Sequence, residues 1–403
     1  MKRHLLFLNP ILIFCFWASA LNIKGASNAL IFILFLCSAF FWRAIQNNSL
    51  RHWALLFALP FLFALTQKFL GFNFKINALD APSRFLLASA CIFMFYQCNA
   101  QHLSKSIAGA IIGALGVGIW AYLSTHIPSF FWIDGQRAWN GFSNPIPFGL
   151  LSLLLGFLAI NVPHAFFPKV PVKLFVFIKL LALYAAFYAA YLSLSRIALL
   201  VLPFLAIVLI LQHAQHSKKI YWHIFLSGVV LSTILFFTDN PYQTRVESSF
   251  SEITEFKKNP NTSMGLRLSM WQDAIELIQQ HPWGMGKNGF INEMRRRHPF
   301  KPKPAPHPHN EYLNFGVEFG IPGIVLAFLI YFVPLIFFYQ HLKKQPNLII
   351  QNAAANGLMV TLSFSIGGLL DCYFWITNQC VFYGLSVMLF VAIILKEKNN
   401  VHL

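Results

Sequence analysis

Apolar runs of about 20 residues recur along the whole chain, and they constrain its fold more than any other feature. A helix of about 20 apolar residues is what crosses the hydrocarbon core of a bilayer. Only 11% of the 403 residues are charged, whereas about 25% are charged in an average soluble domain. The sequence therefore predicts an all-α integral membrane protein.

About twelve membrane spans are expected, and they divide the chain into three parts. Their ranges are 4–21, 27–45, 53–70, 84–99, 107–126, 146–163, 173–193, 197–213, 220–238, 320–340, 348–369 and 373–395. Residues 1–238 hold spans one to nine, residues 239–319 form one large loop, and residues 320–403 hold the last three spans with a short tail.

Lysine and arginine are spread unevenly over the short loops between these spans. If the N-terminus is cytoplasmic, thirteen of them lie in inside segments and five in outside loops. Cytoplasmic loops carry such an excess, so we expect both termini inside and the large loop outside. The formal net charge of +17 then anchors topology and contacts membrane lipids. Nucleic acid is not an expected partner, because the sequence shows no basic soluble domain.

The large loop is expected to contain amphipathic helix. Residues 264–280 have the periodicity of a helix that lies on the bilayer surface or against the bundle. Its expected apolar face carries Leu268, Trp271, Ile275 and Ile278. A glycine-rich turn at 282–290 and a stiff Pro-His-rich stretch at 298–310 follow.

His309 and Asn310 end the Pro-rich stretch, just before the chain re-enters the membrane. A histidine can take a proton from a substrate hydroxyl near neutral pH. His309 is therefore the candidate catalytic base, and Asn310 is a candidate for positioning it or binding a sugar. After nine further residues the chain reads Gly320-Ile321-Pro322-Gly323.

Three arginines from separate segments are candidates for contact with substrate. Arg267 lies near the start of the expected amphipathic helix, in a Gly-x-Arg-x-x-x-Trp sequence, and Arg196 lies in a tight turn between spans seven and eight. A guanidinium offers paired donors to phosphate oxygens, so these two could clamp one pyrophosphate. Arg137 lies in an outer loop before an Asn-Pro pair, where it could bind substrate or position the loop.

Three consecutive arginines, Arg295, Arg296 and Arg297, are candidates for binding an anionic acceptor or lipid headgroups. Lys287 follows a glycine but does not match a nucleotide-binding P-loop. Asp371 lies between the last two spans. It is expected to pair with an arginine or to cap a helix, with no catalytic role.

Metal binding is not expected. His298, His307, His309 and Glu311 lie close together in sequence, but their spacing does not suit a helix-borne metal site. No other cofactor is expected either, since the chain carries no nucleotide motif.

The segment from His309-Asn310 to Gly320-x-x-Gly323 resembles the signature of the bacterial O-antigen ligase family (WaaL type), a relative of the Wzy polymerases and the O-oligosaccharyltransferases. The Arg267 sequence and the Ser195-Arg196-x-Ala198 turn look like the family's two essential arginines. The order of spans, with a large loop before the last three, is also similar. The resemblance covers most of the chain.

This resemblance implies a metal- and ATP-independent, inverting glycosyltransferase in the inner membrane of a Gram-negative bacterium, with its active site facing the periplasm. Arg196 and Arg267 would hold the pyrophosphate of an undecaprenyl-pyrophosphate-linked glycan, and His309 would activate a hydroxyl of the lipid A-core acceptor. A Wzy-type polymerase or a protein O-oligosaccharyltransferase remains an alternative. A transporter or flippase is a more distant alternative, because few charges lie inside the expected spans and no half-repeat is visible.

Overall fold

The computed structural model describes residues 2–127, 137–213, 241–256, 259, 261–297, 305–343 and 346–401. Every regular element in these ranges is a helix, as the apolar runs predict. Before the loop these are α1 (Lys2–Ser19), α2 (Ala26–Ser38), η1 (Ala39–Gln46), α3 (Asn48–Phe69), η2 (Ile76–Leu79), α4 (Asp80–Gln97), α5 (Ala100–Ser106), α6 (Gly109–His126), α7 (Pro145–Ile160), η3 (His164–Phe166), α8 (Val172–Leu192) and α9 (Arg196–His213). From the loop onward they are α11 (Pro241–Thr254), α12 (Ser263–Gln280), α13 (Gly289–Arg297), α14 (Glu311–Leu342), α15 (Leu348–Gly367), η4 (Tyr373–Trp375) and α16 (Thr377–Val401).

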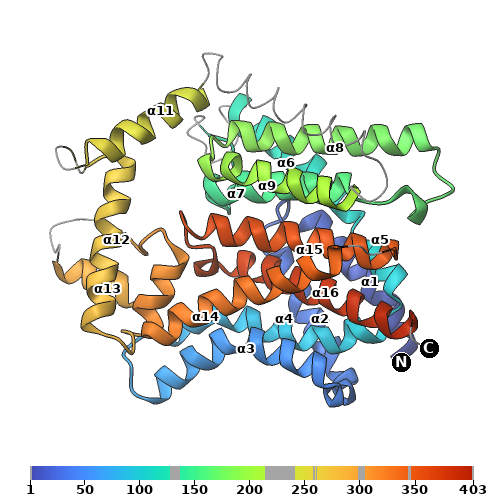
Figure 1. Ribbon diagram of the computed structural model, residues 1–403, viewed down its shortest axis with the longest axis horizontal. Helices are drawn as coiled ribbons and strands as arrows, with labels where there is room; N and C mark the ends of the chain where they lie inside the picture. Colours follow the sequence, from blue (N-terminus) through green and yellow to red (C-terminus); the bar gives the residue numbers. More distant parts are fainter. Residues whose placement is uncertain are drawn as a thin grey trace.

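The long helices form one bundle, and α11, α12 and α13 lie across one end of it (Figure 1). Both termini lie at the opposite end. In this view α14, α15 and α16 run through the middle, with α8 and α9 on one side and α3 and α4 on the other. We call the end that carries α11–α13 the loop end.

Eight helices in the described ranges are long and apolar enough to cross a membrane. Two further apolar helices are shorter, namely Ala26–Phe41, which includes α2, and Pro145–Ile160, which is α7. Each predicted span that falls within these ranges overlaps a helix. The ninth predicted span, 220–238, lies outside the described residues. The count of twelve and the sidedness of the loop therefore stay predictions.

Helix α14 begins at Glu311, nine residues before the predicted tenth span, and it bends sharply at Gly320. Gly320 has φ 72° and ψ −154°, a conformation essentially restricted to glycine. A Cβ built there would lie 2.0 Å from the carbonyl oxygen of Pro282. The N–H of Ile321 donates to that same oxygen at 2.9 Å, and the N–H of Met285 donates to Val317. The glycine-rich turn thus docks backbone to backbone against the bend of α14.

The predicted helix at 264–280 is confirmed as α12. The side of α12 that packs against α13 and α14 is centred on Ala274 and Leu277, which do not belong to the predicted apolar face. Ala274 and Leu277 are buried in a small core with Phe290, Met294 and Val317 of α13 and α14. Ile275, expected on the apolar face that meets the bilayer surface or the bundle, is 47% exposed. The helix packs through its small Ala274 because that side allows close approach to α14, and hydrophobic periodicity alone did not reveal that neighbour.

Candidate functional site

His309 forms a hydrogen-bonded pair with Asp371 at the start of α14. The Nδ1 atom of His309 lies 2.9 Å from the Asp371 carboxylate. The sequence prediction did not identify this carboxylate as the partner of His309, because it expected Asp371 to pair with an arginine or to cap a helix. Its only sequence signal was its place between the last two predicted spans, on the same side of the membrane as His309. A carboxylate at Nδ1 fixes the imidazole tautomer that leaves Nε2 free to accept a proton.

The carboxylate of Asp371 is held in its charged form. Burial acts to raise its pKa, but the hydrogen bond and charge of His309 outweigh burial and hold that pKa below its usual value. The backbone N–H of Cys372 adds a further hydrogen bond at 3.0 Å. A charged Asp371 stabilises the imidazolium that forms when His309 takes a proton.

Asn310 and Glu311 tie this segment to the turn that follows α15. The Asn310 side chain caps α14 by accepting the N–H of Leu313, and it donates to the Leu369 carbonyl at 3.1 Å. Glu311 is completely buried and accepts the N–H of Phe374 at 2.8 Å. Asn310 therefore fastens the start of α14, next to His309, to the segment that follows α15.

His309 itself adopts the left-handed backbone conformation, with φ 52°. Such a conformation is uncommon outside glycine and is often kept at functional sites by the surrounding structure. Here the hydrogen bonds on both sides of His309 impose it. The imidazole is thereby turned toward Asp371 while its side chain stays 27% exposed.

His307 packs against His309, with ring centroids 4.5 Å apart. Burial, together with the charges of His309 and Arg267, lowers the pKa of His307 to about 4, although Asp371 acts in the opposite direction. His307 is therefore neutral at physiological pH. Its Nδ1 faces the backbone N–H of His309 at 3.3 Å, so it supports the backbone of the candidate base.

A metal ion would have to compete with these hydrogen bonds. His307, His309 and Asp371 offer ligand atoms within 4.8 Å of one another. The Nδ1 atoms of both histidines, however, already face hydrogen-bond partners in the structure. The set also differs from the four residues considered from sequence, since it replaces His298 and Glu311 with Asp371.

Arg196 lies in the turn between α8 and α9, residues 193–196, which we call the arginine turn, and Arg137 contacts this turn. Arg196 begins α9 and its guanidinium lies 3.3 Å from the Ser248 hydroxyl of α11. Arg137 donates from Nε to the Ser193 carbonyl at 2.8 Å. Leu194, inside this turn, has φ 52°, so a left-handed residue shapes this segment as it shapes the one at His309.

The arginine turn and the end of α15, which leads to Asp371, both contact the first half of α7. A Cβ at Gly149 would meet Ser193 and Ser195 at 2.0 and 2.8 Å. The adjacent Leu150 lies 3.0 Å from a Cβ built at Gly367, where α15 ends before Asp371. Glycine at these two positions lets the helices approach closely.

Arg267 lies in the first two turns of α12, half-buried. It precedes the completely buried Ala274 by seven residues and so shares its face, toward the bundle. Its charge contributes to the lowered pKa of His307, which places it in the electrostatic surroundings of the histidines. Arg196 is linked to the same loop through α11, whose Glu252 accepts the N–H of Met264 at the start of α12.

The three consecutive arginines differ in their surroundings. Arg297 bridges three carboxylates, those of Asp273, Glu276 and Glu293, and so fastens α13 to α12. Arg296 pairs with Glu293 at 2.6 Å but is 75% exposed, and Arg295 is exposed. A hydrogen bond from Arg296, partly opposed by burial, lowers the pKa of Glu293 to about 2. Arg297 thus has a structural role that its sequence position did not indicate.

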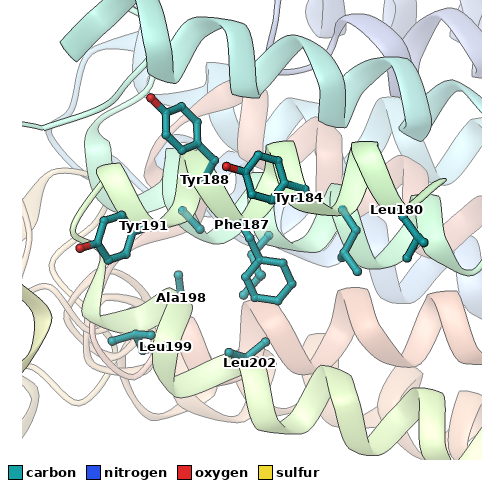
Figure 2. A pocket seen from close by; sticks show the side chains of 11 residues that line it. Leu180, Tyr184, Phe187, Tyr188, Tyr191, Ala198, Leu199 and Leu202 are labelled. Carbon is teal, nitrogen blue, oxygen red and sulfur yellow. The ribbon is translucent and has the colours of Figure 1, made fainter. Parts of the chain in front are cut away.

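An apolar groove of about 490 Å³ lies between α8 and α9 (Figure 2). Leu180, Tyr184 and Phe187 of α8 line it together with Leu199 and Leu202 of α9. The Phe187 ring points toward Leu202, and Tyr191 lies at the end next to the arginine turn. Tyr184 is 68% exposed and Leu180 is 52% exposed. The groove therefore offers an apolar channel on the flank of the bundle that ends beside Arg196.

The arrangement defines a helical membrane protein with a histidine–carboxylate pair, an arginine of α12 in its electrostatic surroundings, and two further arginines at the turn between α8 and α9. Residues 180–328 match the family model described as O-antigen ligase. The matched range includes Arg196, Arg267 and His309, so the resemblance predicted from the motifs is confirmed.

Two relatives are similar to this chain, and one of them is described as an O-antigen ligase. An uncharacterized protein of Haemophilus influenzae is 25% identical over 365 residues, which cover 85% of this chain and 87% of that protein. An O-antigen ligase of Escherichia coli is 24% identical over 234 residues, which cover 56% of this chain and 53% of the ligase. The chain thus spans about half the length of that ligase.

Proposed function

We propose that this protein transfers a glycan from undecaprenyl pyrophosphate to a hydroxyl of the lipid A-core oligosaccharide, at the periplasmic face of the inner membrane. The pair formed by His309 and Asp371 at the loop end carries the proposal. A histidine held by a charged carboxylate is suited to general-base catalysis on a hydroxyl.

In the proposed reaction the Nε2 atom of His309 takes the proton of the acceptor hydroxyl. The acceptor oxygen forms a bond to the anomeric carbon of the donor, and the bond from that carbon to the pyrophosphate oxygen breaks. The anomeric centre is inverted in this single displacement. Asp371 stabilises the imidazolium, and undecaprenyl pyrophosphate leaves with the electron pair.

The leaving pyrophosphate requires positive charge, and Arg196 and Arg267 supply it in this proposal. Both reach the loop end from separate elements, so they can bind the diphosphate from two sides. Arg137 holds the arginine turn through Ser193. The apolar groove between α8 and α9 takes the polyprenyl chain, because it is apolar, lies on the flank of the bundle and ends beside Arg196.

Reconstitution tests this proposal. Purified protein in lipid nanodiscs is given undecaprenyl-pyrophosphate-linked glycan and lipid A-core without nucleotide, in the presence of a metal chelator. We expect transfer by the wild type and a loss of about 10²–10⁴-fold in His309→Ala. His281→Ala changes an exposed histidine of the same loop and serves as the matched control. Full transfer by His309→Ala would falsify the mechanism.

The acceptor class is tested by offering three acceptors in parallel: lipid A-core, a second lipid-linked glycan, and a Ser/Thr-containing peptide. Preference for lipid A-core supports a ligase. Preference for the lipid-linked glycan or the peptide assigns the protein to the polymerases or the O-oligosaccharyltransferases instead. In cells, deletion of a ligase leaves core without attached glycan and accumulates the lipid-linked polymer.

A further inference from the structure

A second, polar pocket of about 240 Å³ lies on the α4 side of the loop end. Three segments far apart in the sequence form it: Asn77 of η2 with Asp80 at the start of α4, Lys287 and Asn288 in the glycine-rich turn, and Trp375 of η4 with Thr377 at the start of α16. We call it the Trp375 pocket. None of the residues assigned above to the transfer reaction lines it.

The Trp375 pocket is connected to the candidate base through aromatic contacts. The rings of Trp375 and His307 lie 5.6 Å apart, and those of His307 and His309 lie 4.5 Å apart. Only one side chain, His307, therefore separates the wall of the pocket from His309. The wall of the pocket thus lies two ring contacts from the candidate base.

Lys287, which lines the pocket, and Arg84, which pairs with the lining residue Asp80, are both neutralised by carboxylates. Lys287 lies 2.6 Å from Glu318, in a pair that is almost completely buried, and Arg84 lies 2.7 Å from Asp80. An anion such as pyrophosphate would have to compete with these carboxylates for the same cations. The charge balance therefore favours an uncharged ligand over a phosphate.

The remaining groups of the pocket suit a sugar. Trp375 offers an aromatic surface, while the amides of Asn77 and Asn288, the Thr377 hydroxyl and the Asp80 carboxylate supply donors and acceptors for hydroxyl groups. Pockets for drug-sized ligands have volumes of roughly 300–1,000 Å³. A smaller pocket with mixed polar and aromatic walls fits a single sugar unit.

The walls of the pocket are held by hydrogen bonds before any ligand binds. Arg84 donates to Asn28 at 2.8 Å, and Asn28 donates to Asn378 at 2.7 Å, which ties α4 to the segment beside Thr377. On the other wall, the side chain of Gln67 donates to the backbone carbonyl of Glu318 at 2.7 Å. Such preorganisation reduces the entropy lost on binding.

We infer that the Trp375 pocket binds a sugar unit of the acceptor, an inference that rests on the proposed function. Helices α8 and α9, with the arginine turn and the apolar groove, lie on the other side of α14–α16 from α4 (Figure 1). In an inverting displacement the nucleophile approaches opposite the leaving group. A donor held on the α8–α9 side therefore leaves the α4 side for the acceptor.

Steady-state kinetics of the reconstituted protein test this inference. In Asn77→Ala and Trp375→Leu we expect the KM for lipid A-core to rise about fivefold or more, because a hydrogen bond or a stacking surface is lost. The KM for the lipid-linked donor should stay within twofold of the wild type. Asn73→Ala, an exposed residue of the same segment outside the pocket, is the matched control. An unchanged KM for lipid A-core in both pocket variants overturns the inference while leaving the proposed function intact.

Binding without turnover separates the two possible sources of the sugar. Saturation-transfer NMR of the wild type is recorded with delipidated core oligosaccharide, with the free donor glycan, and with inorganic pyrophosphate. Signals from the core sugar that weaken in Asn77→Ala support the inference. Signals that depend on Asn77 only for the donor glycan, or displacement of the core sugar by pyrophosphate, overturn it. Absence of transfer by the wild type contradicts the proposed function instead.

Discussion

The two segments that carry the candidate machinery are built in contrasting ways. The His309 segment is fastened to the segment after α15 by two successive residues: Asn310 donates to the Leu369 carbonyl, and the buried Glu311 accepts the N–H of Phe374. The arginine turn at Arg196 borders an apolar groove in which Leu180, Tyr184 and Tyr191 are exposed at the surface of the bundle. Under the proposed function, this contrast separates a fixed geometry for proton transfer from a donor site that must admit and release a long lipid chain. The four predictions below test this contrast.

The largest effect is expected for Asp371→Asn. An amide can donate a hydrogen bond to Nδ1 and so stabilise the tautomer in which Nε2 carries the proton. We expect kcat to fall by about 10²–10⁴-fold with little change in either KM. Single-turnover transfer in nanodiscs measures it, with Asp273→Asn, an ion-pairing residue of α12, as control. A fall of less than threefold would show that Asp371 does not orient the base.

A large loss of stability is expected for Gly320→Ala. The new methyl group meets the Pro282 carbonyl at 2.0 Å, in a backbone conformation that alanine rarely adopts. We expect a loss of about 3 kcal/mol in the free energy of unfolding, measured as thermal or denaturant unfolding in detergent. Gly71→Ala isolates the backbone term, because Gly71 has φ 86° with nothing within 4 Å of its Cβ position. Equal losses in both variants would mean that the docking at Pro282 contributes nothing.

A smaller loss of activity is expected for Arg196→Lys. Lysine keeps the charge but loses the planar pair of donors, so we expect kcat/KM for the donor to fall about 10–30-fold. Arg137→Lys retains one donor for the Ser193 carbonyl and should reduce kcat/KM less than threefold. Equal effects of the two substitutions would contradict the separate roles given to these arginines.

The smallest effect concerns pH and His307. Its pKa, lowered to about 4 by burial and neighbouring charge, lies below the value of about 6.5 expected for the unfolded chain. The free energy of unfolding is thus at its full value above about pH 6.5 and decreases as the pH falls toward 4. Between pH 6.5 and 5 we expect a loss of about 1.5 kcal/mol, measured by unfolding in detergent. His307→Gln should flatten this dependence, and an unchanged slope in that variant would refute the assignment.

Much of the fold could be predicted because membrane helices are encoded locally, in uninterrupted apolar runs. The predicted spans at 197–213 and 348–369, for example, overlap α9 and α15. The face of α12 could not be predicted, since Ala274 is buried by contacts with α13 and α14 that its own periodicity does not contain.

The candidate site was only partly predictable for the same reason. His309 and Arg196 were found through short motifs, and their assignment as catalytic residues remains a prediction. Asp371 was missed because its partner lies 62 residues away in the sequence, and only the fold brings the two together. The role of Arg297 in joining α12 to α13 likewise depends on acidic residues on a different helix.

The exposed flank of the groove between α8 and α9 bears on substrate traffic. Tyr184 and Leu180 leave the groove accessible from the side of the bundle. A carrier lipid that binds there can arrive and depart by lateral diffusion within one leaflet, without its chain crossing water or the bundle separating. Encounter then depends on the two-dimensional density of the carrier in the membrane, and changing the lipid-to-protein ratio of the nanodiscs or vesicles would change turnover at a constant bulk concentration of donor.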